Sequence, residues 1–348
     1  MKNIYVTSSH ERVGKSIFCL ALALRLKKEG INVGYFKPIS DKDEDSDSLH
    51  AKNLLKMEED LTVINPVTIS QWEYDMERKE IKSHLKKIKK SYNLLDKKYD
   101  LLIVEDCRSM GYLSSISLSS RELIKEFDSE VIMLVSGLDE THLDQFVLGE
   151  SFFNDVGICV YGGILTLVPL EIIERIKELA EKRLSEHGIK LMGVIPEKGD
   201  LTAPNVEELC SSIGGRVLSG SSFMDNIVED YLVAAMEMDN ALKFFRRSIN
   251  KAVIVGGDRP ALAIAAMETN TSAIILTGGI LPPTTVLATS EDRGIPVLLV
   301  NEDTYSVVQK LTQAPVQGVL TVTQTDRIEE WDKIFDSIEY KGLIEKLS

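Results

Sequence analysis

The feature that most constrains the fold is a regular alternation of apolar, β-branched runs with segments of helical periodicity. Strands that read as near-continuous apolar runs are buried on both faces, and helices between them favour parallel pairing. The first half of the chain is therefore predicted to be α/β, a parallel sheet with helices on both faces. The apolar runs span residues 3–7, 30–39, 99–107, 129–137, 157–168 and 189–197.

The alternation pauses near residues 199–206, where Gly199, Pro204 and polar neighbours predict a domain boundary. A second series of strands and helices follows, and a last helix is predicted near 326–346. A chain of 348 residues is too long for one ordinary core and long enough for two. The predicted organisation is a P-loop nucleotide-binding domain over 1–203, a smaller α/β domain over 206–320 and a C-terminal helix within 321–348.

The first strand leads directly into "SSHERVGKS", residues 8–16. A phosphate-binding loop (P-loop) consists of a strand end, a loop whose backbone N–H groups surround an anion, and a helix that begins beneath it. In that motif the lysine reaches the phosphates and the serine hydroxyl binds Mg²⁺. A serine in place of the first glycine is acceptable where its backbone angles stay ordinary, and a chance Gly-Lys-Ser before a helix is the alternative. The predicted nucleotide contacts are Ser9, His10, Glu11, Arg12, Val13, Gly14, Lys15 and Ser16.

This loop resembles the variant loop of dethiobiotin synthetase, in which the first glycine is also replaced. "YFKPIS", residues 35–40, is similar to that family's second strand, and the resemblance implies catalytic roles for Lys15 and Lys37 beside the transferred phosphate. "DSDSLH", residues 45–50, and "LLIVEDC", residues 101–107, resemble its magnesium-binding segments. The resemblance therefore implies ATP and Mg²⁺ as cofactors, with Mg²⁺ held by Ser16, Asp47 and Glu105. Asp45 is the second choice in its segment, with a solvated loop charge as its alternative reading.

Two departures from that family bear on function. "EDCRSM", residues 105–110, replaces a glycine-rich loop that shapes the substrate site. Thr166 takes the place of the asparagine that reads adenine, whereas "GVIPE", residues 193–197, keeps the family's form near the base and includes Pro196. The resemblance thus supports phosphate binding more strongly than base specificity or synthetase chemistry.

Residues of about 206–320 resemble the DRTGG domain, through "GGDRPALAIAA" (256–266), "AIILTGG" (273–279) and "GIPVLLVNEDTYSVVQKL" (294–311). A synthetase-like P-loop domain joined to a DRTGG domain is similar to the N-terminal region of long bacterial phosphotransacetylases. Their acetyltransferase domain has no counterpart in this sequence, so no acetyl transfer is expected.

In open α/β sheets, ligands bind beyond the carboxyl ends of the strands. The second half is therefore expected to offer a small-molecule site on one edge of its sheet. In the structural alternative the glycines form tight turns, Asp258 caps a helix start and Pro260 occupies its first turn. The segment 223–245 is similarly open between a core role and an interface helix. The ligand candidates are Gly257, Asp258, Arg259, Thr277, Gly278 and Gly279.

Composition narrows the classes of partner. A net charge of −14 disfavours nucleic acid, because phosphates would be repelled. The basic run at 79–90 is interpreted as the solvated face of an amphipathic helix, in preference to an anion-binding patch. The sequence has no long uncharged apolar run and no signal-peptide pattern, and its four cysteines are widely separated. We therefore expect a cytoplasmic protein with no membrane partner and, from general frequency, a homodimer.

Three functions remain open on these grounds. The first is a regulatory or sensor protein that binds a nucleotide, expected to be Mg-ATP, and is linked to phosphotransacetylase-type metabolism, with or without slow ATP hydrolysis. The second is an ATP-dependent synthetase acting on a small carboxylate or carbamate, which the retained "YFKP" favours. The third is a structural partner with a decayed nucleotide site.

Overall fold

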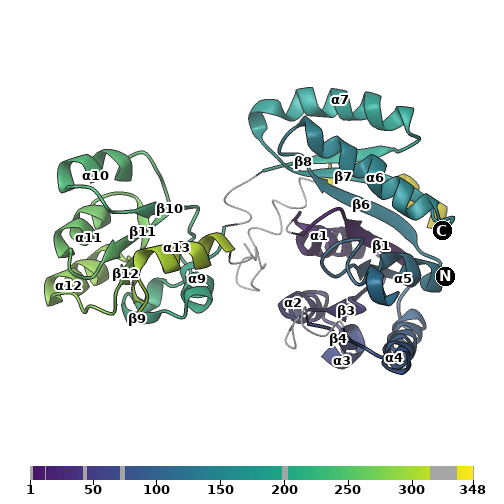
Figure 1. Ribbon diagram of the computed structural model, residues 1–348, viewed down its shortest axis with the longest axis horizontal. Helices are drawn as coiled ribbons and strands as arrows, with labels where there is room; N and C mark the ends of the chain where they lie inside the picture. Colours follow the sequence, from purple (N-terminus) through teal and green to yellow (C-terminus); the bar gives the residue numbers. More distant parts are fainter. Residues whose placement is uncertain are drawn as a thin grey trace. The chain divides into compact units, whose positions relative to one another are not determined.

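The computed structural model describes residues 3–11, 13–41, 45–70, 75–197, 203–313 and 335–347. The chain forms two compact units, each with its own sheet (Figure 1). Unit 1 comprises residues 1–197 together with 319–348, and unit 2 comprises residues 198–318. Within the described ranges, no helix combines the length and the apolar character needed to cross a bilayer.

Unit 1 is built on a parallel sheet with the strand order β2-β5-β1-β6-β7-β8. Each predicted apolar run contributes one strand, and the strands are almost wholly buried, which explains why their sequences lack polar alternation. The direction in which successive strands are added reverses beside β1, and such a reversal is where α/β sheets bind ligands. The strands are β1 (Asn3–Ser8), β2 (Val33–Phe36), β5 (Leu101–Glu105), β6 (Glu130–Ser136), β7 (Val160–Val168) and β8 (Leu191–Pro196).

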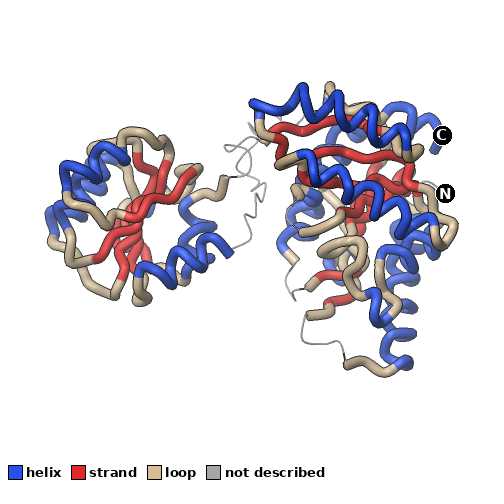
Figure 2. Tube along the Cα trace, turned by 45° about the horizontal axis from the view of Figure 1, so that its top comes forward, coloured by secondary structure: helices blue, strands red, loops and turns tan. Residues whose placement is uncertain are grey.

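Helices cover this sheet along its whole width (Figure 2). α1 and α4 contact the β2-β5-β1 half, whereas α6 and α7 contact the β6-β7-β8 half. The predicted amphipathic helix is confirmed in α4, which buries Ile88, Tyr92 and Leu95 and exposes most of its lysines. The helices of unit 1 are α1 (Lys15–Lys28), α2 (Ser46–Leu55), α3 (Leu61–Ile64), α4 (Arg78–Asp96), α5 (Ser120–Phe127), α6 (Leu143–Asn154), α7 (Ile173–Glu186) and α15 (Lys341–Leu347), with short 3₁₀ turns η1 (Ser114–Ile116), η2 (Glu140–His142) and η3 (Leu170–Ile172).

The second predicted strand is interrupted, which corrects the continuous run expected over 30–39. β2 ends at Phe36, and a separate strand β3 (Ile39–Ser40) pairs with β4 (Val67–Thr68). Lys37 turns its backbone N–H to the carbonyl of Ile64 at 3.0 Å. Pro38 has no N–H with which to continue the ladder. The interruption leaves Lys37 at the carboxyl edge of the main sheet.

Unit 2 has a five-stranded sheet in the order β10-β11-β12-β13-β9, in which β9 alone runs antiparallel to its neighbour. Alternate residues of each central strand belong to different cores. Val253 and Val255 join the core beneath α10, α11 and α12, whereas Ala252 and Ile254 join the core beneath α9 and α13. The sheet therefore lies between two helical layers (Figure 2).

The elements of unit 2 extend the series expected from the sequence. The segment 223–245 contains a strand and a helix, β10 and α10, in place of the single interface helix considered above. They are α9 (Val206–Ile213), β9 (Arg216–Ser219), η4 (Ser221–Phe223), β10 (Asp230–Val233), α10 (Met238–Phe245), β11 (Lys251–Gly256), α11 (Pro260–Met267), β12 (Thr271–Thr277), α12 (Thr284–Arg293), β13 (Val297–Leu299) and α13 (Thr304–Gln313).

The end of the chain packs on unit 1. Phe335 stacks on Phe18 of α1, with ring centroids 5.3 Å apart. The backbone N–H of Glu339 donates to the carbonyl of Met192 in β8. The chain turns over residues 336–340 before α15 begins, so the uninterrupted helix predicted near 326–346 is wrong in its described part.

Candidate functional site

The corner between β1 and α1 has the backbone of an anion-binding loop. Gly14 occupies the position before α1 with φ 77° and ψ 24°, a left-handed conformation that glycine adopts without strain. The space beside its α-carbon is open. Among the described residues, none accepts a hydrogen bond from the backbone N–H of Glu11, Val13 or Gly14. The corner thus presents unused donors at the positive end of a helix.

Lys15 lies beneath this corner. Its side-chain nitrogen donates to Ser8 Oγ at 3.1 Å and to the carbonyl of Arg108 at 3.0 Å, and the residue is 8% exposed. The ammonium is therefore held inside the loop, with its charge unpaired by any carboxylate in the described chain. An ammonium so placed attracts an anion that enters the corner.

Ser16 joins the corner to a group of acids. Its hydroxyl donates to Glu105 Oε1 at 2.7 Å and lies 3.0 Å from Asp47 Oδ2. Glu105 is the last residue of β5, and Asp47 lies in the first turn of α2. Residues separated by 31 and 89 positions thus meet at the carboxyl edge of β1 and β5.

Lys37 neutralises that group. Its ammonium lies 2.7 Å from Asp45 Oδ1, 2.7 Å from Asp47 Oδ2 and 3.6 Å from Glu105 Oε1. The side chain is 8% exposed, so these attractions act in a poorly hydrated environment. Three carboxylates against one ammonium leave a net negative charge beside the phosphate loop.

The ionisation of these groups is tightly linked. Burial raises the pKa of Glu105, and the nearby Lys37 charge opposes that rise. Burial also works against ionised Asp47, but the charge of Lys37 and its hydrogen bond hold the pKa of Asp47 below its usual range. Burial would lower the pKa of Lys37, yet the charges of Glu105, Asp47 and Asp45 raise it well above its usual value. The cation at this position therefore keeps the acids ionised.

Asp45 has a structural task besides its ion pair. Its Oδ2 accepts from the backbone N–H of Ser48 at 2.8 Å and from the Ser48 hydroxyl at 2.6 Å, which caps α2. Its side chain is 9% exposed, so the solvated loop charge considered for Asp45 is wrong.

The oxygen atoms of Ser16, Asp47 and Glu105 fit the requirements of a divalent cation. They are hard oxygen ligands grouped within hydrogen-bonding distance, and the Lys37 ammonium shows that a positive charge is stabilised among them. A search of the described residues for three or more His, Cys, Asp or Glu side chains arranged as metal ligands finds none. The predicted set differs from such a cluster because it has only two carboxylates; water and phosphate oxygens would complete the shell.

The rim of the corner includes residues that sequence reasoning did not select. His10 Nε2 lies 3.0 Å from Ser136 Oγ at the end of β6, and Ser9 Oγ lies 2.6 Å from His10 Nδ1. Burial lowers the pKa of His10, and the neighbouring His142 and Lys15 lower it further. Ser9 has no positive φ, so it meets the condition under which it can replace glycine. Arg12 lies outside the described residues.

Two further contacts were missed. Arg108 Nε donates to Glu11 Oε1 at 2.6 Å and so connects the loop after β5 to the phosphate loop. Tyr35 donates to Glu105 Oε2 at 2.7 Å. The alternation along a strand places Tyr35 and Lys37 on the same face, and that pattern was the available signal for Tyr35. The contact of Arg108 with Glu11 joins residues 97 apart, and no local pattern reports it.

Asp106, which takes the place of a glycine in the resembling family, is a structural residue in this fold. It is 4% exposed and accepts hydrogen bonds from Tyr5, Thr7 and Ser120. These bonds fix the turn after β5 and position the neighbouring Glu105.

The predicted base contacts lie on the same edge of the sheet as the phosphate loop. Thr166 pairs in register with Ser136 near the end of β7, and Pro196 ends β8. Thr166 is 3% exposed and its hydroxyl lies 3.4 Å from the carbonyl of Val135. A role for Thr166 and Pro196 in nucleotide binding stays a prediction.

The candidates in unit 2 gather at the carboxyl ends of β11 and β12, but their backbone donors are already used. The N–H of Gly257 donates to Thr277, that of Gly278 to Glu302 and that of Gly279 to Val300. The hydroxyl of Thr277 lies 2.9 Å from that of Thr304.

The helix that follows starts differently from the structural alternative. Arg259, rather than Asp258, occupies the N-cap position of α11, and no side chain caps it. Pro260 is in the first turn as expected. Asp258 and Arg259 are exposed, and their ligand role stays a prediction.

The parallel sheet, the glycine-lysine-serine corner and the acids beside it define unit 1 as a P-loop NTPase-like domain. The chain belongs to the family described as AAA domain, whose profile matches residues 2–205. The profile of the DRTGG domain matches residues 208–314.

Individual relatives agree with this assignment. A phosphate acetyltransferase of Nitratidesulfovibrio vulgaris is 24% identical over 332 residues, which cover 89% of this chain and 47% of the relative. The ATP-dependent dethiobiotin synthetase BioD of Methanocaldococcus jannaschii is 29% identical over 211 residues, 57% of this chain and 95% of the relative. The chain thus spans about half the length of the phosphate acetyltransferases it matches. Among solved structures, a ParA family ATPase from Chlorobium tepidum TLS aligns with 58% of this chain and 87% of its own at 15% identity and a TM-score of 0.38.

Proposed function

We propose that the protein is a nucleotide-responsive regulatory protein, linked to phosphotransacetylase-type metabolism, whose unit 1 binds Mg-ATP at the β1–α1 corner. The observation that carries the proposal is the meeting of Lys15, Ser16, Asp47 and Glu105 at one sheet edge, beside unused backbone donors. The match of 89% of the chain to a phosphate acetyltransferase supports the metabolic link. The homodimer and the cytoplasmic location remain predictions.

Each residue of the site has a defined part in this proposal. The N–H groups of the loop and the Lys15 ammonium would bind the phosphates. Bound Mg²⁺, held by Ser16, Asp47 and Glu105, would supply charge neutralisation for the phosphate oxygens. Lys37 would face the terminal phosphate, because its ammonium lies among the same acids.

The test is the thermal stability of the full chain with Mg-ATP, with Mg-GTP and with ATP plus EDTA. A ligand at about 100 times its Kd stabilises the folded state by about 2.7 kcal/mol. We expect Mg-ATP to raise the Tm by about 5 °C or more. Lys15→Ala should abolish the rise, and the exposed Lys87→Ala on α4 should preserve it. Identical melting temperatures in all ligand conditions would refute nucleotide binding.

A second function, phosphorylation of a small carboxylate or carbamate by ATP, is favoured by the placement of Lys37. Its buried ammonium lies beside the Ser16–Glu105 pair, where it would meet both a transferred phosphate and an anionic acceptor. Phosphate release by the same protein, measured with and without candidate acids, separates the two functions. A rate stimulated by an acid supports the synthetase and counts against a purely regulatory role.

A further inference from the structure

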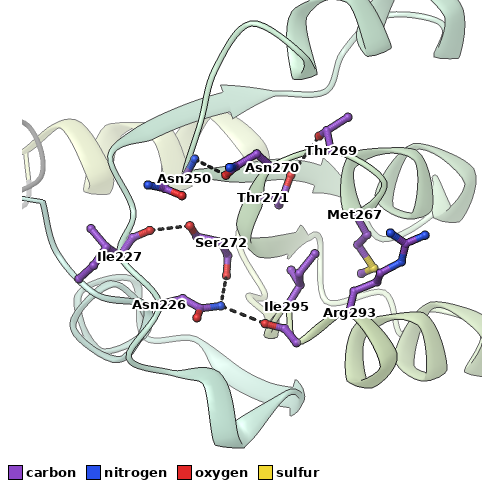
Figure 3. Close-up of a pocket in the computed structure, with 11 residues that line it drawn as sticks. Asn226, Ile227, Asn250, Met267, Thr269, Asn270, Thr271, Ser272, Arg293 and Ile295 are labelled. Carbon is purple, nitrogen blue, oxygen red and sulfur yellow. Dashed lines mark hydrogen bonds between the residues drawn. The ribbon is translucent and has the colours of Figure 1, made fainter.

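A polar hollow of about 540 Å³ opens in unit 2 at the edge where β11 and β12 begin (Figure 3). This is the opposite edge from the one at which the sequence predicted a ligand. Its size is within the range of small-molecule sites. The wall is formed by the segment before β10, the turns before β11 and β12, and the end of α12.

Three asparagines from three separate loops line the hollow (Figure 3). Asn226 Nδ2 donates to the carbonyls of Ser272, at 3.3 Å, and Gly294, at 3.0 Å. Asn250 Nδ2 donates to Glu229 Oε1 at 2.6 Å, and Asn270 Oδ1 accepts from the backbone N–H of Asn250 at 2.7 Å. One end of each carboxamide is therefore held by the protein.

The other end of each carboxamide is unused within the described chain. Asn226 Oδ1 and Asn250 Oδ1 are two acceptors, and Asn270 Nδ2 is a donor, with no partner among the described residues. Carboxamides whose orientation is fixed from behind are preorganised for a planar ligand edge.

The turns that carry these groups are held together by Lys251. This residue is wholly buried, and its ammonium donates to the carbonyls of Ser248 and Asn270, one from each turn. Asn250 has a positive φ of 46°, a strained conformation that persists only where its surroundings impose it. The two asparagines are therefore fixed relative to each other.

Arg293 supplies a positive charge at the same hollow. It is the last residue of α12, it is exposed, and it forms no ion pair or hydrogen bond with any described residue. Met267 and Ile295 add apolar surface to the wall. An unpaired guanidinium beside amide groups and apolar atoms suits a ligand with one anionic group and one flat polar ring.

We propose that this hollow is a binding site for a nucleoside monophosphate. The free carboxamide atoms pair with the hydrogen-bonding edge of the base, as asparagine does with bases elsewhere, and Arg293 pairs with the phosphate. The site lies entirely within unit 2 and goes beyond the nucleotide site proposed for unit 1.

The test measures binding of AMP, GMP, CMP and UMP to the full chain by isothermal titration calorimetry. All proteins carry Lys15→Ala and all buffers contain EDTA, so that the site proposed in unit 1 is disabled and a failure here leaves that proposal untouched. We expect at least one of the four to bind. Arg293→Ala should weaken that binding about tenfold or more, because a charge-assisted hydrogen bond is lost.

Two further variants locate the site. Asn270→Asp keeps the oxygen that accepts from Asn250 and removes the donor, so binding should again weaken about tenfold. Arg259→Ala removes an exposed arginine from the opposite edge of the same sheet and should leave binding unchanged. The proposal is overturned if none of the four nucleotides binds. It is equally overturned if Arg259→Ala weakens binding while Arg293→Ala does not, or if neither Arg293→Ala nor Asn270→Asp has an effect.

Discussion

At the scale of single residues, the character of the unit 1 site is decided by Lys37. One ammonium lies against three carboxylates, and all four groups are largely buried. A buried charge that loses its partner is far more costly than an exposed one. Lys37 is therefore as important to the stability of the site as to any chemistry there.

The substitution Lys37→Met removes that ammonium and keeps the apolar stem. We expect the free energy of unfolding at pH 7 to fall by about 3–5 kcal/mol, because buried carboxylates lose their counter-charge. In the wild type Lys37 lowers the pKa of Asp47, so ionised Asp47 contributes stability above its unfolded pKa of about 3.9, and this contribution is lost as pH falls through the folded pKa. The deficit of the variant should accordingly shrink as the pH is lowered toward about 4.

Urea unfolding of both proteins at a series of pH values measures this deficit. Lys87→Met, at an exposed position on α4, is the matched control and should follow the wild type at every pH. A deficit for Lys37→Met that stays constant with pH would contradict the electrostatic explanation.

At the scale of elements, the close approach of helix to sheet depends on small residues in β7. Phe146 of α6 is 1% exposed and packs over Gly163. A Cβ atom added at Gly163 would lie 2.3 Å from Phe146 Cε1, well inside contact distance. The glycine therefore sets how near α6 can come to β7, and with it the position of the β6 and β7 ends at the site.

Gly163→Ala should destabilise the protein by about 1–3 kcal/mol through overpacking. The double substitution Gly163→Ala with Phe146→Leu should cost less than the sum of the two single ones, since the smaller side chain relieves the clash. A cycle of urea-unfolding measurements gives this coupling. Gly111→Ala is the control, because Gly111 has open space around it and no positive φ. Equal stability of Gly163→Ala and Gly111→Ala would refute the packing argument.

At the scale of the whole molecule, the chain leaves unit 1, forms unit 2 and returns. The returning segment buries Phe335, Ile338, Tyr340 and Leu343. Arg25 of α1 donates to Asp336 at 3.1 Å and to the Tyr340 hydroxyl at 3.0 Å. Unit 1 is consequently completed only by residues that follow unit 2 in the sequence.

Phe335→Ala should therefore destabilise unit 1 selectively. Removing a buried phenylalanine costs about 3–5 kcal/mol, and the lost stacking on Phe18 belongs to α1. Hydrogen exchange read by mass spectrometry should show faster exchange in the strands of unit 1 and unchanged exchange in unit 2. Phe244→Ala, at a side chain of unit 2 that is 45% exposed, should change neither. An equal rise of exchange in both units would show that the segment does not act on unit 1 alone.

The sequence by itself determined the strands of both sheets, the phosphate-loop corner at Gly14–Ser16 and the acids that accompany it, because periodicity and short motifs are local properties of the chain. It did not determine that Lys37 would lie among Asp45, Asp47 and Glu105, that Arg108 would pair with Glu11, or that residues after 334 would complete unit 1. Those contacts depend on strand order and on the packing of distant segments; the bond from Ser16 to Glu105, for example, joins residues 89 positions apart. The polar hollow in unit 2 was equally beyond sequence reasoning, since its asparagines come from separate turns that only the folded sheet brings to one edge.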